Sequence, residues 1–290
     1  GPAEKDRHGA RFLNGSSLGP LSLPGKKMKI HHLNCGTLHA PFVHIDSLVY
    51  CLLVESGSRL VLVDTGFGLR DYTQPTPKMR FFLHYMGVPR DPAETALHQV
   101  SALGYQAEDV TDIICTHLHI DHAGGLSDFP RANVHIYKKE YQAAQKPQGM
   151  MGFAYLPTQW AHGPHWVFHE QRDETWFGLD AIQVLATPET SFYLLPLPGH
   201  TPGHCGAAIG STGNWLLHCG DAASPFHPLT DLHDRGPDAY RLAFFPRKIT
   251  EGLAGPHASR LKALLTEHAG EIRGISSHDI YSFKEYHQAH

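Results

Sequence analysis

At 290 residues, with 41% hydrophobic and 18% charged residues, the chain has the size and composition of a globular protein with a large core. Its formal net charge of −4 lacks the basic surplus of most nucleic-acid-binding proteins. No apolar run reaches the roughly 18–20 residues that a membrane span requires. We therefore expect neither nucleic acid nor a membrane as a partner.

The N-terminal segment differs in composition from the rest of the chain. Gly1-Pro2 is typical of what remains after a protease removes a tag, and residues 1–27 are rich in Gly, Pro, Ser and Lys. We predict a tag remnant or flexible segment over 1–27 and a single domain over 28–290.

The five cysteines are odd in number, and no two of them form a Cys-x-x-Cys pair. Most lie inside apolar, strand-like stretches. This pattern predicts buried free thiols in a reducing compartment, so we expect a cytoplasmic protein.

In chain order, the hydrophobic patterns predict strands first, then strands and helices in alternation. The expected strands are 29–33, 48–54, 60–63, 112–115, 132–137, 181–186, 192–197, 204–209, 214–218 and 273–277. The expected helices are 93–103, 138–146 and 257–268. Runs of strands with helices between and after them predict an α+β fold, an αββα sandwich of two mixed sheets flanked by helices.

Two stretches, 71–91 and 146–178, fit no regular element, and long loops of this kind often form lids or binding sites. Both are rich in aromatic and Met side chains, which either wall an apolar substrate pocket or pack the loops onto the body of the protein. The candidates for the pocket wall are Phe81, Phe82, Tyr85, Met86, Met150, Met151, Phe153, Tyr155, Trp160 and Trp166.

The strongest local signal is the sequence THLHIDHAGG at 116–125, directly after a predicted buried strand. It holds four side chains that can bind a metal within six residues: His117, His119, Asp121 and His122. So many polar groups cannot pack into a core, but a turn at a strand end can point them to one side. The pattern therefore predicts a metal site.

Three further polar residues follow predicted strands. His200 lies in PGHTPGH, where two Gly and two Pro force a tight turn. Asp221 ends the apolar run LLHCGD, and His278 follows GISS. Taken alone, each is an ordinary turn residue. Because strand ends of packed sheets meet at one edge, we expect all of them to converge on the first motif.

Together these motifs resemble the metallo-β-lactamase superfamily, and the resemblance extends over most of the chain. It rests on VLVDTG at 61–66, HLHIDHAGG, PGHTPGH, HCGDA at 218–222 and SSHD at 276–279. It implies one metal site of His117, His119 and His200, a second of Asp121, His122 and His278, and a shared ligand, Asp221. It also implies that Asp64 supports a ligand from behind, although Asp64 alone is equally a turn residue.

Imidazole and carboxylate ligands suit two divalent ions, zinc first, with iron, manganese or cobalt as alternatives. Two such ions about 3.5–4 Å apart lower the pKa of a shared water toward about 7. We therefore expect a dinuclear metal-dependent hydrolase that uses a metal-bridging hydroxide, with Asp121 as the catalytic group that accepts a proton.

Within the superfamily, the motif order and the closing His278-Asp279 are most similar to the N-acyl-homoserine lactonases. This similarity implies a small-molecule lactone or other carboxylic ester with an apolar part as substrate. One departure is that this group carries a Tyr shortly after the shared Asp, where this chain has Ala-Ala-Ser-Pro. Ser224 occupies roughly that place, and His227 and Tyr281 are other candidates for the substrate pocket.

Other activities of the same superfamily stay open. They are a thioesterase of the glyoxalase II type, a phosphodiester hydrolase and an iron-dependent sulfur dioxygenase. A β-lactamase is disfavoured, because those members generally lack an Asp at the position of Asp221. The oligomeric state is open as well, a homodimer included.

Overall fold

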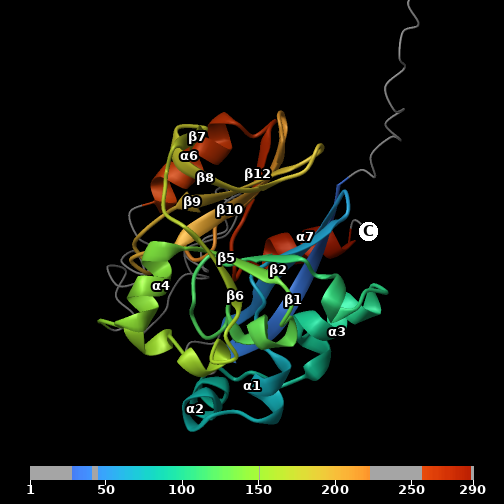
Figure 1. Cartoon of the computed structure of the whole chain (residues 1–290), viewed down its shortest axis with the longest axis vertical. Coiled ribbons are helices and arrows are strands. Elements are labelled where there is room, and N and C mark those ends of the chain that lie inside the picture. Colours follow the sequence, from blue (N-terminus) through green and yellow to red (C-terminus); the bar gives the residue numbers. More distant parts are fainter. Residues whose placement is uncertain (1–27, 41–44, 150, 223–256, 289–290) are drawn as a thin grey trace, which may run out of the picture.

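The computed structural model describes residues 28–40, 45–149, 151–222 and 257–288, so the predicted segment 1–27 lies outside the described residues. The described strands form two six-stranded sheets (Figure 1). In spatial order, the first sheet contains β1 (Lys29–Ala40), β2 (Ile45–Ser56), β3 (Arg59–Val63), β4 (Asp112–Ile114), β5 (Asn133–Tyr137) and β6 (His165–His169). The second contains β12 (Ile272–Ile275), β11 (Asn214–His218), β10 (Cys205–Ser211), β9 (Ser191–Pro196), β8 (Leu179–Ala186) and β7 (Glu174–Trp176).

Both sheets are mixed. In the first sheet, β1, β2 and β3 pair antiparallel, and β3 to β6 pair in parallel. In the second, β7 to β11 pair antiparallel and β12 joins β11 in parallel. The predicted α+β fold of two mixed sheets with flanking helices is therefore confirmed.

The core lies in layers that follow the two-residue period of the strands. In β2, Tyr50 and Leu52 pack in the cluster that also holds Phe192 of the second sheet. Cys51 and Leu53, which alternate with them, face the opposite side and pack under the helices. Because both faces of β2 are covered, its sequence is a nearly continuous apolar run.

Helices flank the two sheets (Figure 1). They are α1 (Leu69–Thr73), α2 (Pro77–Tyr85), α3 (Ala96–Ala102), α4 (Lys138–Gln145), α6 (Ala258–Glu267) and α7 (Ile280–Gln288). Leu261, Leu264 and Leu265 of α6, which corresponds to the helix predicted over 257–268, pack against the second sheet. No helix in the described part of the chain has the length and hydropathy to cross a bilayer. All five cysteines are free and buried, as predicted.

The prediction that 71–91 has no regular structure is wrong. Part of α1 and the whole of α2 lie there. Thr76 caps α2 by accepting a hydrogen bond from the Met79 backbone N–H, and Pro77 occupies the first helical position, where its missing N–H costs nothing. Met79 and Leu83, one turn apart, bury the inner face of the helix.

The prediction for 146–178 is also wrong, since β6 and β7 lie in that stretch. Both strands are short and lie at sheet edges, where one side of the backbone has no neighbouring strand. Neither strand alternates between buried and exposed side chains along its length, and that alternation is the pattern by which a sequence predicts a half-buried strand. The helix α7 was not predicted. Ile280 and Phe283 on α7 pack onto the cluster between the sheets.

Candidate metal centre

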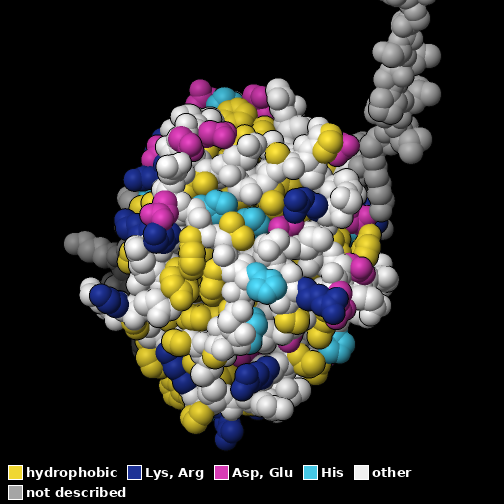
Figure 2. All heavy atoms as spheres, in the orientation of Figure 1, with side chains coloured by type: hydrophobic (Ala, Val, Ile, Leu, Met, Phe, Trp, Pro, Cys, Tyr) yellow, Lys and Arg dark blue, Asp and Glu magenta, His cyan; other side chains and the backbone are white. Residues whose placement is uncertain are grey.

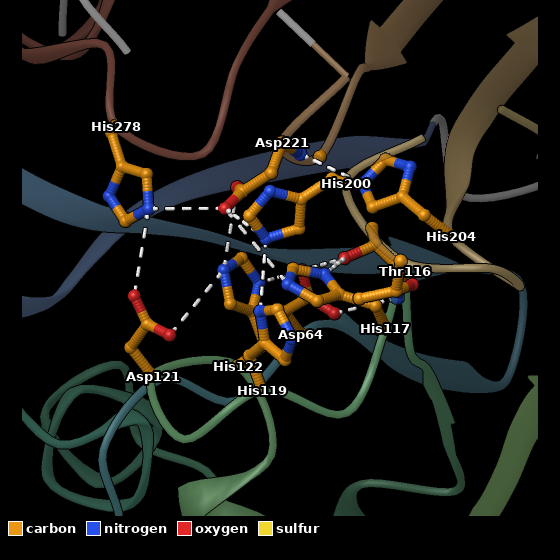
Figure 3. Close-up of polar contacts among 12 residues, drawn as sticks. Asp64, Thr116, His117, His119, Asp121, His122, His200, His204, Asp221 and His278 are labelled. Atoms are coloured by element: carbon orange, nitrogen blue, oxygen red, sulfur yellow. Dashed lines mark hydrogen bonds and ion pairs between the residues drawn. The ribbon is translucent and has the colours of Figure 1, made fainter. Parts of the chain in front are cut away.

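The loops that follow β4, β9, β11 and β12 meet at one edge of the sandwich, and Figure 3 shows their polar side chains pointing toward one another. Three overlapping groups have ligand atoms within 4.8 Å of one another. These groups are His117 with His119 and His200, His117 with His122 and Asp221, and Asp121 with His122 and His278. The structure thus gathers all seven side chains that the sequence motifs singled out.

Asp221 lies at the centre of this cluster. Its carboxylate oxygens lie 3.2 Å from His200 Nε2, 3.5 Å from His122 Nε2, 3.6 Å from His278 Nε2 and 4.0 Å from His117 Nε2. One carboxylate therefore faces imidazoles from both predicted metal sites.

Asp121 lies at the outer side of the cluster. Its two oxygens lie 3.9 Å from His122 Nε2 and 3.6 Å from His278 Nε2. His278 is in turn fixed by its other ring nitrogen, since Nδ1 donates to the Leu48 carbonyl at 2.9 Å. That hydrogen bond leaves Nε2 of His278 facing the carboxylates.

The electrostatic field of the cluster favours a positive charge near the carboxylates. Burial lowers the pKa of His122, but Asp221, Asp121 and Asp64 outweigh burial and raise that pKa to about 10. At the other side of the cluster, burial and neighbouring imidazoles lower the pKa of His117 and His119 well below the usual value. Their ring nitrogens are therefore neutral and have lone pairs to offer.

The buried polar atoms of this cluster fit metal ions. Within the described part of the chain, His117 Nε2, His122 Nε2 and Asp221 Oδ1 are buried without a hydrogen-bond partner. His119 Nδ1 and His200 Nε2 face each other at 2.9 Å. Such atoms are costly to leave unsatisfied, and a cation would satisfy them. Nitrogen and carboxylate donors suit zinc, iron, manganese or cobalt.

Asp64 supports the loop that carries His117 and His122 from behind. It is fully buried, and it accepts hydrogen bonds from the Thr116 backbone N–H at 2.8 Å, the Thr116 hydroxyl at 2.7 Å and His122 Nδ1 at 2.9 Å. Because Asp64 accepts the proton of Nδ1, Nε2 is the ring nitrogen of His122 that faces Asp121 and Asp221 and that would bind a cation.

His204, to which the sequence analysis assigned no role, positions Asp221. His204 accepts a hydrogen bond at Nε2 from the Asp221 backbone N–H at 2.9 Å and donates from Nδ1 to the Leu197 carbonyl. Burial lowers the pKa of His204 to about 3, so the ring stays neutral. Gly220 has a φ of +56°, and a Cβ on it would lie 2.5 Å from His204 Nε2. The PGHTPGH motif contains His204 and could have indicated it.

Glu140, in the first turn of α4, is another supporting residue that the sequence analysis missed. Its buried carboxylate accepts from the Leu118 backbone N–H at 3.0 Å, the Tyr155 hydroxyl at 3.0 Å and the Thr201 hydroxyl at 2.5 Å. Leu118 lies between two predicted ligands and Thr201 follows a third. Glu140 therefore ties two ligand loops together, and nothing in its local sequence signals that role.

A second buried carboxylate supports the same loop from the other side. Asp71 Oδ2 accepts from the Gly68 backbone N–H at 3.0 Å and from Gln159 Nε2 at 2.9 Å. Gln159 Nε2 also donates to the Ile120 carbonyl at 2.7 Å. Burial raises the pKa of Asp71 to about 7.

This raised pKa predicts that stability falls as the pH rises. The unfolded chain releases the Asp71 proton near 3.8 and the folded chain near 7, so stability decreases between those values and is level above them. Because a single oxygen accepts both hydrogen bonds, Asp71→Asn keeps them without a charge. We expect the variant to match the wild type at pH 4 and to melt about 5 °C higher at pH 8, measured by circular dichroism.

Burial also raises the pKa of Asp128 to about 6. Asp128 therefore makes stability fall with rising pH in both the wild type and Asp71→Asn. The exposed Asp91→Asn is the control and should run parallel to the wild type. Parallel melting curves for Asp71→Asn and the wild type from pH 4 to 8 would contradict the prediction.

The aromatic candidates for a substrate pocket divide into two groups. Phe82, Met86 and Trp166 pack against the core, and Tyr155 and Trp160 are buried in it, as the alternative of loop packing expects. Met151 is partly buried, and Met150 lies outside the described residues. The candidates that remain exposed are Phe81, Tyr85 and Phe153, at 58%, 44% and 59%. The Phe81 and Tyr85 rings stack at 5.9 Å, and Phe153 lies under Lys78 Nζ at 4.5 Å. Ser224 and His227 lie outside the described residues, and Tyr281 is exposed on α7.

An αββα sandwich with histidines and carboxylates from four strand ends gathered at one edge defines a class of candidate metalloproteins. A family model described as the metallo-beta-lactamase superfamily matches residues 45–265. The chain belongs to this superfamily.

Among curated proteins, a probable metallo-hydrolase of Mycobacterium tuberculosis is 42% identical over 199 residues, which are 68% of this chain and 63% of that protein. The chain thus matches less than two thirds of the length of this relative. An N-acyl homoserine lactonase of Agrobacterium fabrum is 30% identical over 179 residues, 61% of this chain and 65% of that protein.

Among solved structures, an N-acyl homoserine lactone hydrolase with N-hexanoyl-L-homoserine bound at its catalytic metal centre has a TM-score of 0.60. It is 22% identical, and the alignment covers 90% of this chain and 96% of that chain. A dizinc quorum-quenching lactonase has a TM-score of 0.53 at 20% identity, covering 89% and 90%. These similarities show the fold.

Proposed function

We propose that the chain is a dinuclear metal-dependent hydrolase that acts on a lactone or another carboxylic ester. The observation that carries the proposal is the position of Asp221. Its carboxylate lies 3.2–4.0 Å from Nε2 of four imidazoles that belong to two ligand groups. A single carboxylate in that position suits two cations better than one.

In this proposal His117, His119 and His200 hold one ion, Asp121, His122 and His278 hold the other, and Asp221 contacts both. Two bound divalent ions, zinc in our proposal, would supply hydroxide near neutral pH and polarise the ester carbonyl. Asp121 is 14% exposed and lies at the outer side of the cluster, where it is placed to accept a proton. His204, Asp64 and Glu140 keep the ligands in place.

The substrate class rests on the relatives. The superfamily covers many reactions, and a shared fold does not choose among them. Several curated relatives are N-acyl homoserine lactonases, and one similar structure holds an acyl-homoserine product at its metal centre. The exposed aromatic rings of Phe81, Tyr85 and Phe153 support a small molecule with an apolar part. A single domain over 28–290 remains part of the proposal.

The test combines metal analysis with a hydrolysis panel of lactones, aryl esters, thioesters, phosphodiesters and β-lactams. We expect about two divalent ions per chain, turnover of a lactone or ester, and loss of that turnover with a chelator. Preferred turnover of thioesters or phosphodiesters would replace the proposed substrate class. One redox-active iron per chain with dioxygen consumption and no hydrolysis would overturn the proposal in favour of a sulfur dioxygenase.

A further inference from the structure

A cavity of about 300 Å³ lies beside α4, next to the candidate metal centre. Its polar lining includes Lys139, Gln142, Lys146 and Gln148, and its described lining holds no carboxylate. All four of these side chains donate hydrogen bonds, and two carry a positive charge. In a chain with a formal net charge of −4, this is a local excess of positive charge.

The two cavity lysines, Lys139 and Lys146, differ from Lys138 and Lys78 in their interactions. Lys138 forms an ion pair with Glu170, and Lys78 donates to the Tyr155 carbonyl at 2.7 Å. Within the described ranges, no ion pair involves Lys139 or Lys146. Lys139 lies in the first turn of α4, and Lys146 directly follows the last residue of that helix. Figure 2 shows basic side chains beside an apolar patch on the side of the molecule where α4 lies.

The cavity shares walls with the metal centre. Tyr155 lines the cavity, and its ring lies edge-on to the His119 ring with centroids 4.9 Å apart. Thr201 also lines it and directly follows His200 in the chain. Both residues hydrogen-bond to Glu140, so this wall is fixed. A ligand that fills the cavity therefore lies beside one end of the ligand cluster.

We propose that this cavity binds an anionic group, a carboxylate or a phosphate, on the ester or lactone substrate. The inference rests on the proposed function and narrows its substrate class. Ala143, Met151 and Pro202 supply the apolar part of the lining, which suits a short carbon chain between the anion and the ester. The lysine ammonium groups attract the anion, and added salt weakens that attraction.

The test compares two esters of equal length in the metal-loaded protein: the mono(4-nitrophenyl) ester of glutaric acid and 4-nitrophenyl pentanoate. We expect kcat/KM to favour the anionic ester. The Lys139→Gln, Lys146→Gln double variant should lower kcat/KM about tenfold for the anionic ester and less than about twofold for the neutral one. Lys138→Gln, whose lysine is already paired with Glu170, is the matched control and should keep the preference.

A third ester, of 4-phosphonobutanoic acid, distinguishes the two anions. If the two lysines raise kcat/KM for this ester more than for the glutaric acid ester, the cavity selects phosphate. If they raise it less, the cavity selects carboxylate. Equal kcat/KM for charged and neutral esters in the wild type would overturn the inference. So would an equal loss on both esters in the double variant, or the same loss in Lys138→Gln.

A binding measurement distinguishes failure of this inference from failure of the proposed function. The amide of glutaric acid with aniline resists hydrolysis, and its dissociation constant can be measured by calorimetry. We expect the double variant to weaken its binding about tenfold, whether or not any ester is hydrolysed. Lysine-dependent binding without ester turnover would overturn the proposed function and keep the anion site. Binding that is unchanged in the double variant would overturn the anion site.

Discussion

Asp221→Asn is expected to remove most of the metal from the purified protein and to lower kcat/KM for the best ester or lactone about 10³-fold or more. The asparagine has the shape of the aspartate and retains the backbone N–H that donates to His204. It lacks the negative charge that faces four imidazole Nε2 atoms, the nearest at 3.2 Å. With that charge gone, Asp121 is the one carboxylate left among the seven residues. Metal content by mass spectrometry and kcat/KM are the measurements.

The matched control is Asp128→Asn, which neutralises a partly buried carboxylate outside the ligand cluster. Asp128 accepts a hydrogen bond from the Leu69 backbone N–H at 2.9 Å. This variant should keep two metals and its activity. The circular dichroism of both variants reports whether the fold is intact. A folded Asp221→Asn protein with two tightly bound ions and normal turnover would show that Asp221 is not a shared ligand.

The positions of the seven clustered side chains were predictable because each follows a strand. A turn of Gly and Pro, as around His200, ends a strand and places its polar residue in the loop that follows. The two mixed sheets bring the ends of β4, β9, β11 and β12 to the same edge, and that fold was available from the resemblance of the motifs. That these side chains bind metals stays a prediction.

The supporting residues were less predictable, because their roles arise from tertiary contacts. Glu140 stands in the polar sequence KKEYQ, which is typical of a solvent-exposed helix start. It is buried because Gly203 approaches so closely that a Cβ there would lie 2.1 Å from the Glu140 backbone nitrogen. No periodicity in the sequence reports an approach between segments 60 positions apart.

Local signals for two helices were present but were outweighed by composition. Thr76-Pro77 is a cap followed by proline at the first helical position, and it begins α2. The surrounding Pro and aromatic residues favoured a loop instead. Similarly, Asp279 precedes α7 and accepts hydrogen bonds from the backbone N–H groups of Tyr281 and Ser282. Because Asp279 also pairs with His278 in the closing motif, its capping role is not apparent from the sequence.

The second large effect is expected from Asp64→Asn, although Asp64 is not itself a predicted metal ligand. Asp64 Oδ2 accepts from His122 Nδ1 at 2.9 Å and from the Thr116 hydroxyl at 2.7 Å. An amide N–H₂ in place of that oxygen favours the His122 tautomer with its proton on Nε2, the atom 3.5 Å from Asp221. We expect about 10–100-fold weaker binding of one metal, while the ion held by His119 and His200 stays bound.

A competition titration with a chromophoric chelator measures the two binding steps of Asp64→Asn separately. Thr116→Val is the matched control, because it deletes the contacts of the hydroxyl with Asp64 and with His117 Nδ1 but leaves the Asp64–His122 contact, so it should weaken the step that involves His122 much less. The decisive observation is whether Asp64→Asn weakens one metal-binding step or both. A general loss of packing around a buried charge would weaken both steps and lower the melting temperature of the metal-free protein. If both steps weaken equally, Asp64 acts on the fold of the loop; if only the step that involves His122 weakens, Asp64 acts through the imidazole proton.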